Sequence, residues 1–243
     1  MKNILSALRF FTILPLGAGD GQFAPRRLAA SLPAAGLIVG LLTAAFDLLA
    51  SRLWPGPAAA ALDVVFLAVV SGALHLDGLA DTADGLYGGK TRERALEIMK
   101  DSRTGAMGVA AVACCLLAKW AGIFSLDAPS RFLFLTLVPA YARGSALFGF
   151  AFLSYGRQGD GTGRAFFDEP LSVADFRWLI LPAALSLLAG WRCLVLNAGF
   201  AAVVAVVLMF YKKRINGITG DMLGAMIEVT ETLLFLAVAT RLS

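Results

Sequence analysis

Charged residues are scarce in this chain: Lys, Arg, Asp and Glu together make up only 16% of its 243 residues. Soluble domains carry roughly a quarter of charged residues, so the composition argues against a soluble globular protein. Apolar residues make up 58% of the chain, and the mean hydropathy is +0.76. These values indicate a membrane protein.

Histidine and cysteine are also rare, with one histidine and three cysteines in the whole chain. Cys114 and Cys115 are adjacent within one apolar run, and Cys193 begins another. Structural zinc sites need about four His or Cys ligands at regular spacings. The sequence therefore argues against a zinc or haem site.

Internal repeats, linkers and low-complexity stretches are missing, which favours a single membrane-embedded domain over residues 1–243. The apolar residues 1–16 contain Lys2, Arg9 and Pro15, and no small-residue cleavage site follows them. A removable signal peptide is thus not expected. An amphipathic helix that lies in the membrane interface fits this segment better.

Long apolar runs dominate the rest of the chain. A helix that crosses the hydrocarbon core needs about 20 apolar residues, and seven runs approach that length. They cover residues 29–50, 58–76, 105–126, 131–153, 176–190, 193–211 and 221–240. The expected fold is all-α: a polytopic integral membrane protein with about seven transmembrane helices and short amphipathic interfacial helices, of which residues 91–100 form one.

Basic residues predict the orientation. With seven spans and an inside amino terminus, fifteen basic residues fall inside and four outside, which the positive-inside rule favours. The inner set is Lys2, Arg9, Arg26, Arg27, Lys90, Arg92, Arg94, Lys100, Arg103, Arg157, Arg164, Arg177, Lys212, Lys213 and Arg214; the outer set is Arg52, Arg131, Arg192 and Arg241. The polar motifs are therefore expected at the cytoplasmic face.

The segment "HLDGLADTADG", residues 75–85, places three carboxylates after the second apolar run. In a helix, Asp77, Asp81 and Asp84 would share an arc of about 60°. Like charges this close repel each other or require a cation, and carboxylate oxygens suit Mg²⁺ or Mn²⁺. The alternative is a solvated helix end. His75 points to the other side of the helix, where a buried or interfacial hydrogen-bonding histidine is expected.

Two further inner segments could bind an anion. In "DSRTG", residues 101–105, a Ser or Thr such as Ser102 could cap the following helix, whose free N–H groups would bind a phosphate together with Arg103. Asp101 could join the metal site. The glycine-rich loop 155–170 carries Arg157 and Arg164 and could fold over an anionic ligand. The alternatives are a plain helix cap and a loop that is glycine-rich for turn reasons.

The last apolar run also contains acids. Asp221 and Glu228 are separated by seven residues and share one helix face, and Glu231 follows three residues later. Carboxylates within a span are functional by default. Arg143 and Lys119, also at membrane depth, are their expected partners. Arg143 and Glu228 are predicted to bind substrate, and the alternative for the two cations is snorkelling or structural pairing.

Four segments together resemble the cobalamin synthase family (adenosylcobinamide-GDP ribazoletransferases). They are "LRFFTILPL", "HLDGLADTADGLYGG", "EIMKDSRTGAMGV" and "GITGDMLGA". The resemblance spans nearly the whole chain. It implies an enzyme of the cell (inner) membrane that completes the nucleotide loop of cobamides, joining adenosylcobinamide-GDP to α-ribazole or its 5′-phosphate and releasing GMP with Mg²⁺. It implies the corrinoid, the ribazole and the lipid bilayer as partners but no nucleic acid, and is compatible with a homo-oligomer or association with other cobamide-assembly enzymes.

Under this resemblance the aspartates have catalytic roles. Mg²⁺ would bind Asp77, Asp81 and Asp84; Asp101 or Asp221 would complete its coordination, and one carboxylate would accept the hydroxyl proton. Phosphate oxygens would pair with Arg103 and with Arg157 or Arg164. The residues alone, without the resemblance, support only metal-assisted chemistry on a phosphate at the cytoplasmic face.

Three other classes of protein compete with this interpretation. A CDP-alcohol phosphotransferase needs a differently spaced aspartate and arginine signature, which is absent here. A membrane prenyltransferase should have a second Asp-rich motif, of which Asp221 with Glu228 is a poor copy. A secondary transporter places its charges near the midplane within inverted repeats, whereas these acids cluster at the inner surface.

Overall fold

The computed structural model describes residues 2–17, 24–157 and 163–240. In this part of the chain the regular structure is helical, and the β-type pairing is one isolated bridge between Tyr155 and Ile218. The prediction of an all-α protein is therefore confirmed.

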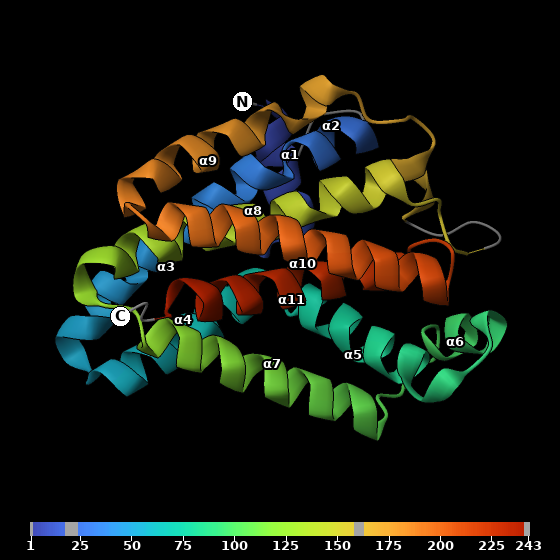
Figure 1. Cartoon of the computed structure of the whole chain (residues 1–243), viewed down its shortest axis with the longest axis horizontal. Helices are drawn as coiled ribbons and strands as arrows, with labels where there is room; N and C mark the ends of the chain where they lie inside the picture. The colour runs from blue at the N-terminus through green and yellow to red at the C-terminus, as the bar shows by residue number, and fades with distance from the viewer. Residues whose placement is uncertain (1, 18–23, 158–162, 241–243) are drawn as a thin grey trace.

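The helices are arranged as Figure 1 shows. The α-helices are α1 (Lys2–Phe11), α2 (Pro25–Ala30), α3 (Leu32–Leu53), α4 (Gly56–Val70), α5 (Leu74–Leu86), α6 (Arg92–Ile98), α7 (Ala106–Phe124), α8 (Ala128–Phe152), α9 (Ile180–Ser186), α10 (Arg192–Arg214) and α11 (Gly220–Val238). The short 3₁₀ helices are η1 (Tyr87–Gly89), η2 (Arg164–Phe167), η3 (Val173–Leu179) and η4 (Leu187–Ala189).

The seven predicted membrane spans are not confirmed, because length and composition support four or five candidate spans. Among the described residues, four helices are long and apolar enough to cross a bilayer: α3, α7, α8 and α10. The bent pair of α4 with α5 and η1 would make a fifth. The run 176–190 is helical but broken into η3, α9 and η4, and α11 carries three acids and lies largely buried within the bundle. Several apolar helices nevertheless indicate a membrane protein, as the composition predicted.

The second predicted span is broken rather than continuous. Gly72 and Ala73 have φ values of +58° and +56°, and this left-handed backbone ends one right-handed helix before the next begins. The two helices meet at an angle of 88°. Since α5 is nevertheless helical from Leu74 to Leu86, the spacing that puts the three aspartates on one face is retained.

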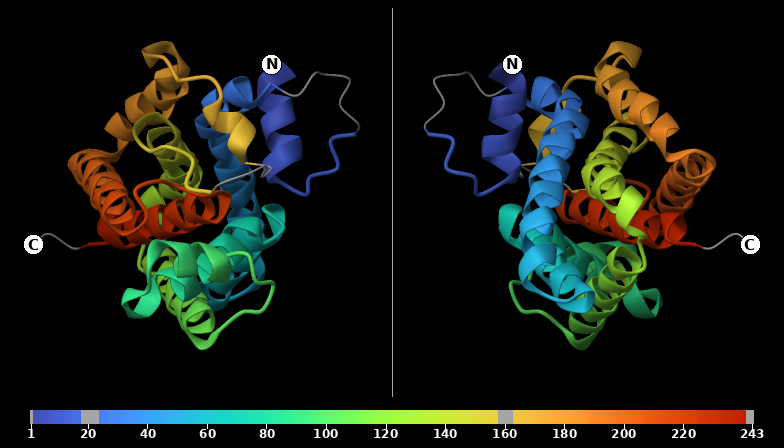
Figure 2. Two further views of the ribbon diagram at one scale, coloured as in Figure 1. Left: turned by 90° about the vertical axis from the view of Figure 1, so that its right-hand side faces the viewer. Right: turned by 90° about the vertical axis from the view of Figure 1, so that its left-hand side faces the viewer.

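Helix α11 is the centre of the bundle and packs against α5, α7, α8 and α10 (Figures 1 and 2). Buried ion pairs attach it to α7 and α8. Lys119 Nζ lies 2.5 Å from Glu228 Oε2 and 2.8 Å from Glu231 Oε1, and Arg143 Nη1 lies 3.3 Å from Glu231 Oε2. All four side chains are at most 6% exposed. The predicted pairing with Lys119 and Arg143 is confirmed for Glu228 and Glu231, whereas Asp221, for which it was also predicted, pairs with Arg157.

Glycines allow the helix backbones to approach closely. A Cβ atom on Gly78 of α5 would lie 2.6 Å from the Asp221 carbonyl oxygen, and one on Gly224 of α11 would lie 3.2 Å from the His75 Cα. The same holds for Gly36 of α3, whose added Cβ would lie 2.4 Å from the Pro139 carbonyl oxygen of α8. Small residues at such contacts are typical of helix packing within membranes.

The polar segments gather at one end of the bundle. The end of α5, the short helix α6 and the turn between α10 and α11 lie together at the right of Figure 1. The α3–α4 and α7–α8 connections lie at the opposite end. There Arg131 pairs with Asp47 at 2.9 Å and with Asp63 at 2.7 Å. Helix α6 has seven residues, which rise about 10 Å, too little to cross the hydrocarbon core.

The buried pairs of α11 lead to a stability prediction. Glu231→Gln would leave Arg143 and Lys119 with less negative charge in a buried site, which typically destabilises a protein by about 3–5 kcal/mol. Arg94→Ala is the control, because its pair with Glu97 is exposed and such pairs contribute about 0–1 kcal/mol. Thermal unfolding of both detergent-purified variants should show a large shift for Glu231→Gln alone. Equal shifts would contradict the structural role of the pairs.

Candidate functional site

The acidic face of α5 lies beside the amino-terminal end of α11. Asp77 is exposed, whereas Asp81, Asp84 and Asp221 are partly buried. Asp81 experiences the negative charges of Asp77, Asp221 and Asp84, and the positive charge of Arg157 opposes them. Since Gly78 lets the two backbones approach, carboxylates that are far apart in sequence form one negatively charged cluster.

Asp84 has a structural role that the local sequence does not predict. Its carboxylate oxygens accept hydrogen bonds from the backbone N–H groups of Gly105 and Gly108, with N–O distances of 2.6 and 2.8 Å. These groups stand at the start of α7, where N–H groups otherwise lack partners. A Cβ atom on Gly105 or Gly108 would lie within 2.6 Å of the Asp84 carboxylate. Both glycines are therefore needed for the contact.

This contact corrects the prediction for residues 101–105. Gly105, not Ser102, is the capping residue of α7, and it supplies no side-chain hydrogen bond. The carboxylate of Asp84 accepts hydrogen bonds from two of the N–H groups at this helix start, where a phosphate was expected to bind together with Arg103. Ser102 itself is exposed.

Asp101 and Arg103 pair with each other on the exposed loop. Arg103 Nη2 lies 2.6 Å from Asp101 Oδ2, and Nε lies 3.0 Å from Oδ1. These hydrogen bonds from Arg103 lower the pKa of Asp101 to about 2. The Arg103 side chain is 87% exposed, so it is accessible to a ligand from the surface. Its phosphate-binding role, and the role of Asp101, stay predictions.

Arg157 connects the glycine-rich loop to the cluster. Its Nη2 atom lies 2.5 Å from Asp221 Oδ2 and donates to the Met99 carbonyl oxygen at 3.1 Å. The loop's residues 158–162 lie outside the described part of the chain. Arg164 is exposed and begins η2. The loop thus brings one of its two predicted arginines into contact with a predicted catalytic aspartate.

Arg143 and Glu228 lie elsewhere, within the buried ion pairs around α11. They are 2% and 4% exposed, and their charges are engaged by Glu231 and Lys119. The alternative of structural pairing accounts for this placement. Their predicted role in substrate binding stays a prediction.

A cavity of about 680 Å³ borders the cluster and is called the carboxylate cavity here. Asp77 and Asp221 line it together with His75, from α5 and α11. Its remaining walls are largely apolar: Phe10, Phe11, Leu32, Leu74, Ala146, Phe150, Gly163, Ala165, Phe166, Gly220, Leu223, Gly224 and Ile227. Sequence reasoning missed these aromatic residues; the only signal was the pair Phe10–Phe11 in the amino-terminal segment.

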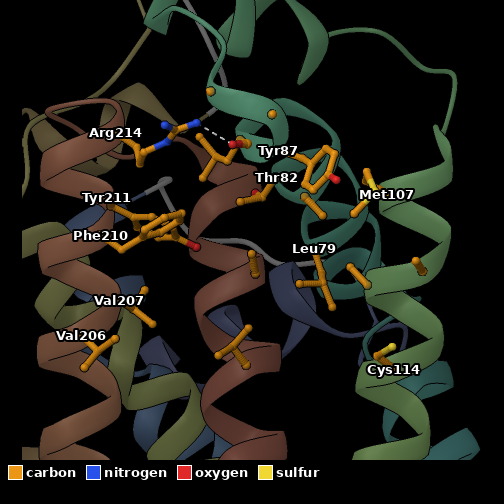
Figure 3. Close-up of a pocket in the computed structure, with 18 residues that line it drawn as sticks. Leu79, Thr82, Tyr87, Met107, Cys114, Val206, Val207, Phe210, Tyr211 and Arg214 are labelled. Atoms are coloured by element: carbon orange, nitrogen blue, oxygen red, sulfur yellow. Dashed lines mark hydrogen bonds between the residues drawn. The ribbon is translucent and has the colours of Figure 1, made fainter.

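A second cavity of about 770 Å³, the Arg214 cavity, lies between α5, α7, α10 and α11 (Figure 3). Its lining residues are mostly apolar and include no carboxylate. Arg214 lies at one end, where its Nη2 atom donates to the Leu86 carbonyl oxygen at 2.6 Å. The two cavities thus differ in chemistry, and the one beside Asp77 and Asp221 is the candidate reaction site.

The carboxylate cluster suits a hard divalent cation by donor type and charge. Among the described residues, no three His, Cys, Asp or Glu side chains already converge as a metal site. Asp84 is the least available donor, because backbone N–H groups engage both of its oxygens. The binding of Mg²⁺ by Asp77, Asp81 and Asp84, with Asp101 or Asp221 completing the coordination, stays a prediction.

The Asp84 contact can be tested through the glycines that permit it. Gly108→Ala would place a methyl group 2.5 Å from Asp84 Oδ2, and such overpacking typically destabilises by about 1–3 kcal/mol. Gly56→Ala is the control, because its nearest neighbour would be an ordinary 3.5 Å contact with Phe124. Thermal unfolding should show a lower midpoint for Gly108→Ala only. A Gly108→Ala midpoint equal to that of Gly56→Ala would remove the case for this contact.

Known proteins of one family match this sequence over nearly its full length. Residues 3–239 match the family described as cobalamin-5-phosphate synthase. An adenosylcobinamide-GDP ribazoletransferase of Mesorhizobium japonicum is 38% identical, covering 100% of this chain and 95% of the relative. The adenosylcobinamide-GDP ribazoletransferase of Geotalea daltonii is 36% identical, and the match covers 93% of this chain and 92% of the relative. The enzyme of the same name from Clostridium novyi is 32% identical, and the match covers 98% of this chain and 96% of the relative.

No solved structure matches the chain. The family match covers the acidic helix α5, the start of α11 and the phenylalanines of α1, so it includes both sides of the carboxylate cavity. On the length of the match and the identity of its relatives, the chain belongs to the cobalamin-5-phosphate synthase family.

Proposed function

We propose that this protein is an adenosylcobinamide-GDP ribazoletransferase that completes the nucleotide loop of a cobamide. It transfers the adenosylcobinamide-phosphate group to a ribose hydroxyl of α-ribazole, or of α-ribazole 5′-phosphate, and releases GMP. The observation that carries the proposal is the match to ribazoletransferases along almost the whole chain. The carboxylate cluster beside a cavity supplies the chemistry that such a transfer needs.

The reaction is a displacement at phosphorus. The acceptor oxygen forms a bond to the phosphorus that carries cobinamide, the bond from this phosphorus to the bridging oxygen breaks, and GMP leaves with that electron pair. The hydroxyl proton passes to a carboxylate. Asp77 and Asp221 are the candidates, because both line the cavity and a base must reach the proton that it accepts.

Magnesium bound by Asp77, Asp81 and Asp221 would neutralise phosphate charge and stabilise the leaving group. The positive charge of Arg157 also neutralises negative charge at this site. Its contacts with Asp221 and the Met99 carbonyl oxygen orient the guanidinium at the cluster, where it can also bind a phosphate oxygen. Asp84 fixes α5 against the start of α7 and so positions the other aspartates.

We place the site at the cytoplasmic face of the inner membrane. The polar end of the bundle carries α6 and the Lys212–Arg214 end of α10, which suits the side where basic residues accumulate. Self-association and association with other cobamide-assembly enzymes stay predictions.

The topology can be tested with a membrane-impermeant thiol reagent on intact cells. Arg52→Cys, at the opposite end of the bundle and exposed, should be labelled from outside. Lys213→Cys should be labelled only after the membrane is opened. The parent chain, with its exposed Cys114, is the control for background. Labelling of Lys213→Cys in intact cells would reverse the orientation.

The function is tested with purified enzyme in lipid, supplied with adenosylcobinamide-GDP, α-ribazole and Mg²⁺. The enzyme should form a cobamide and GMP. Asp81→Asn should reduce GMP release at least about 100-fold, because several kcal/mol of transition-state stabilisation are lost with one carboxylate charge. Glu93→Gln, on exposed α6, should have little effect.

Two results would contradict the proposal. Wild-type enzyme that releases no GMP would remove the ribazoletransferase assignment and favour a transporter. Normal turnover by Asp81→Asn across a titration to low Mg²⁺ would show that the cluster is only a solvated helix end.

A further inference from the structure

The carboxylate cavity has one aromatic side and one polar side. Four phenylalanines from three separate parts of the chain form the aromatic side. The rings of Phe150 and Phe166 stack with centroids 5.4 Å apart, and the Phe166 ring lies 5.7 Å from Phe10 and 6.3 Å from Phe11. Figure 2 shows α1 beside the segment that carries Phe166. The short helix η2 is therefore attached to α1 through aromatic contacts.

Part of this aromatic side remains accessible. Phe10 is 45% exposed although its ring contacts both Phe11 and Phe166. Phe11 and Phe150 are half-buried and line the cavity. Flat aromatic faces at such positions offer stacking surfaces to a planar ring.

The polar side contains an unsatisfied group. His75 is 3% exposed and lines the cavity, and its Nε2 atom has no hydrogen-bond partner among the described residues. A buried polar atom without a partner is unfavourable. His75 and Asp77 lie on different sides of α5 but both line this cavity, so a hydroxyl-bearing ligand that fills it lies close to both residues.

Size separates the two substrates of the proposed reaction. A cavity of about 680 Å³ falls within the range of roughly 300–1,000 Å³ in which drug-sized ligands bind. A nucleoside fits such a volume, whereas a corrin macrocycle with its side chains and attached GDP does not. The aromatic side also suits an uncharged planar base better than a polar, charged corrinoid diphosphate.

We propose that the carboxylate cavity is the binding site for the acceptor nucleoside, α-ribazole. Its benzimidazole base lies among Phe11, Phe150 and Phe166, and its ribose faces His75. The reacting ribose hydroxyl then points to Asp77 and Asp221, at which the donor's pyrophosphate arrives from the polar end of the bundle. This inference rests on the proposed function and specifies which of the two substrates the cavity takes.

The first test separates the two substrates by steady-state kinetics. Phe11→Ala should raise the KM for α-ribazole about 10-fold or more, as expected for the loss of one stacking partner, and leave the KM for adenosylcobinamide-GDP unchanged. Phe210→Ala is the matched control, since it removes the same side chain from the Arg214 cavity. A raised KM for adenosylcobinamide-GDP alone, or no change in either KM, would overturn the inference.

The second test concerns His75. His75→Phe keeps a planar ring but removes the nitrogen that would contact the ribose, so the KM for α-ribazole should rise while that for adenosylcobinamide-GDP stays constant. His75→Asn restores a polar group and should recover part of the affinity. Equal KM values for α-ribazole in wild type and His75→Phe would exclude this contact.

The third test measures binding directly, through the rise in unfolding temperature that a ligand causes, and can also be applied to variants of lower stability. α-Ribazole alone should raise the unfolding temperature of the wild type and of Phe210→Ala, but not that of Phe11→Ala; the milder Phe11→Leu replaces Phe11→Ala if the latter does not fold. A shift of equal size in the Phe11 variant would contradict the site.

If wild type forms cobamide and GMP but the Phe11 and Phe210 variants behave alike, the inference fails while the proposed function stands. If no GMP forms, the proposed function itself fails.

Discussion

Pairing of charge in a medium that excludes water is the constraint on which the rest of this structure depends. Glu228 and Glu231 lie in the middle of the bundle, where an unpaired carboxylate would be strongly unfavourable. Lys119 and Arg143 supply the opposite charges from two other helices. These ion pairs define how α11 sits against α7 and α8. Because Asp221 is the second residue of α11, the same pairing also fixes one half of the candidate reaction site.

The other half depends on how closely α5 approaches α11. Gly78 and Gly224 remove the side chains that would separate the two backbones, and the left-handed turn at Gly72 and Ala73 directs α5 toward this contact. The helix pair then divides the space around it into two cavities of similar volume but different chemistry. Only one of them borders carboxylates. The arrangement therefore separates a cavity without carboxylates from the candidate reaction site, which borders Asp77 and Asp221.

Local patterns in the sequence predicted those features that depend on one helix or on the balance of charge. The spacing of the α5 aspartates, and the pairing of Glu228 and Glu231 with Lys119 and Arg143, follow from helical periodicity and from the instability of unpaired charge. The break at residues 71–73, the capping of α7 by Asp84 and the broken run 176–190 were not predicted. Each depends on contacts or backbone geometry that hydropathy does not encode. The aromatic side of the cavity was missed for the same reason, since its phenylalanines meet only in the folded chain.

The carboxylate cavity joins the first helix of the chain to the last one. A ribosome synthesises the chain from its amino terminus onward, so Phe10 and Phe11 are made long before Asp221. During that interval the polar side of the carboxylate cavity is incomplete. The cavity is complete only when α11 has packed against α5, α7 and α8. A chain that still lacks α11 therefore has the aromatic side of the cavity without its second carboxylate.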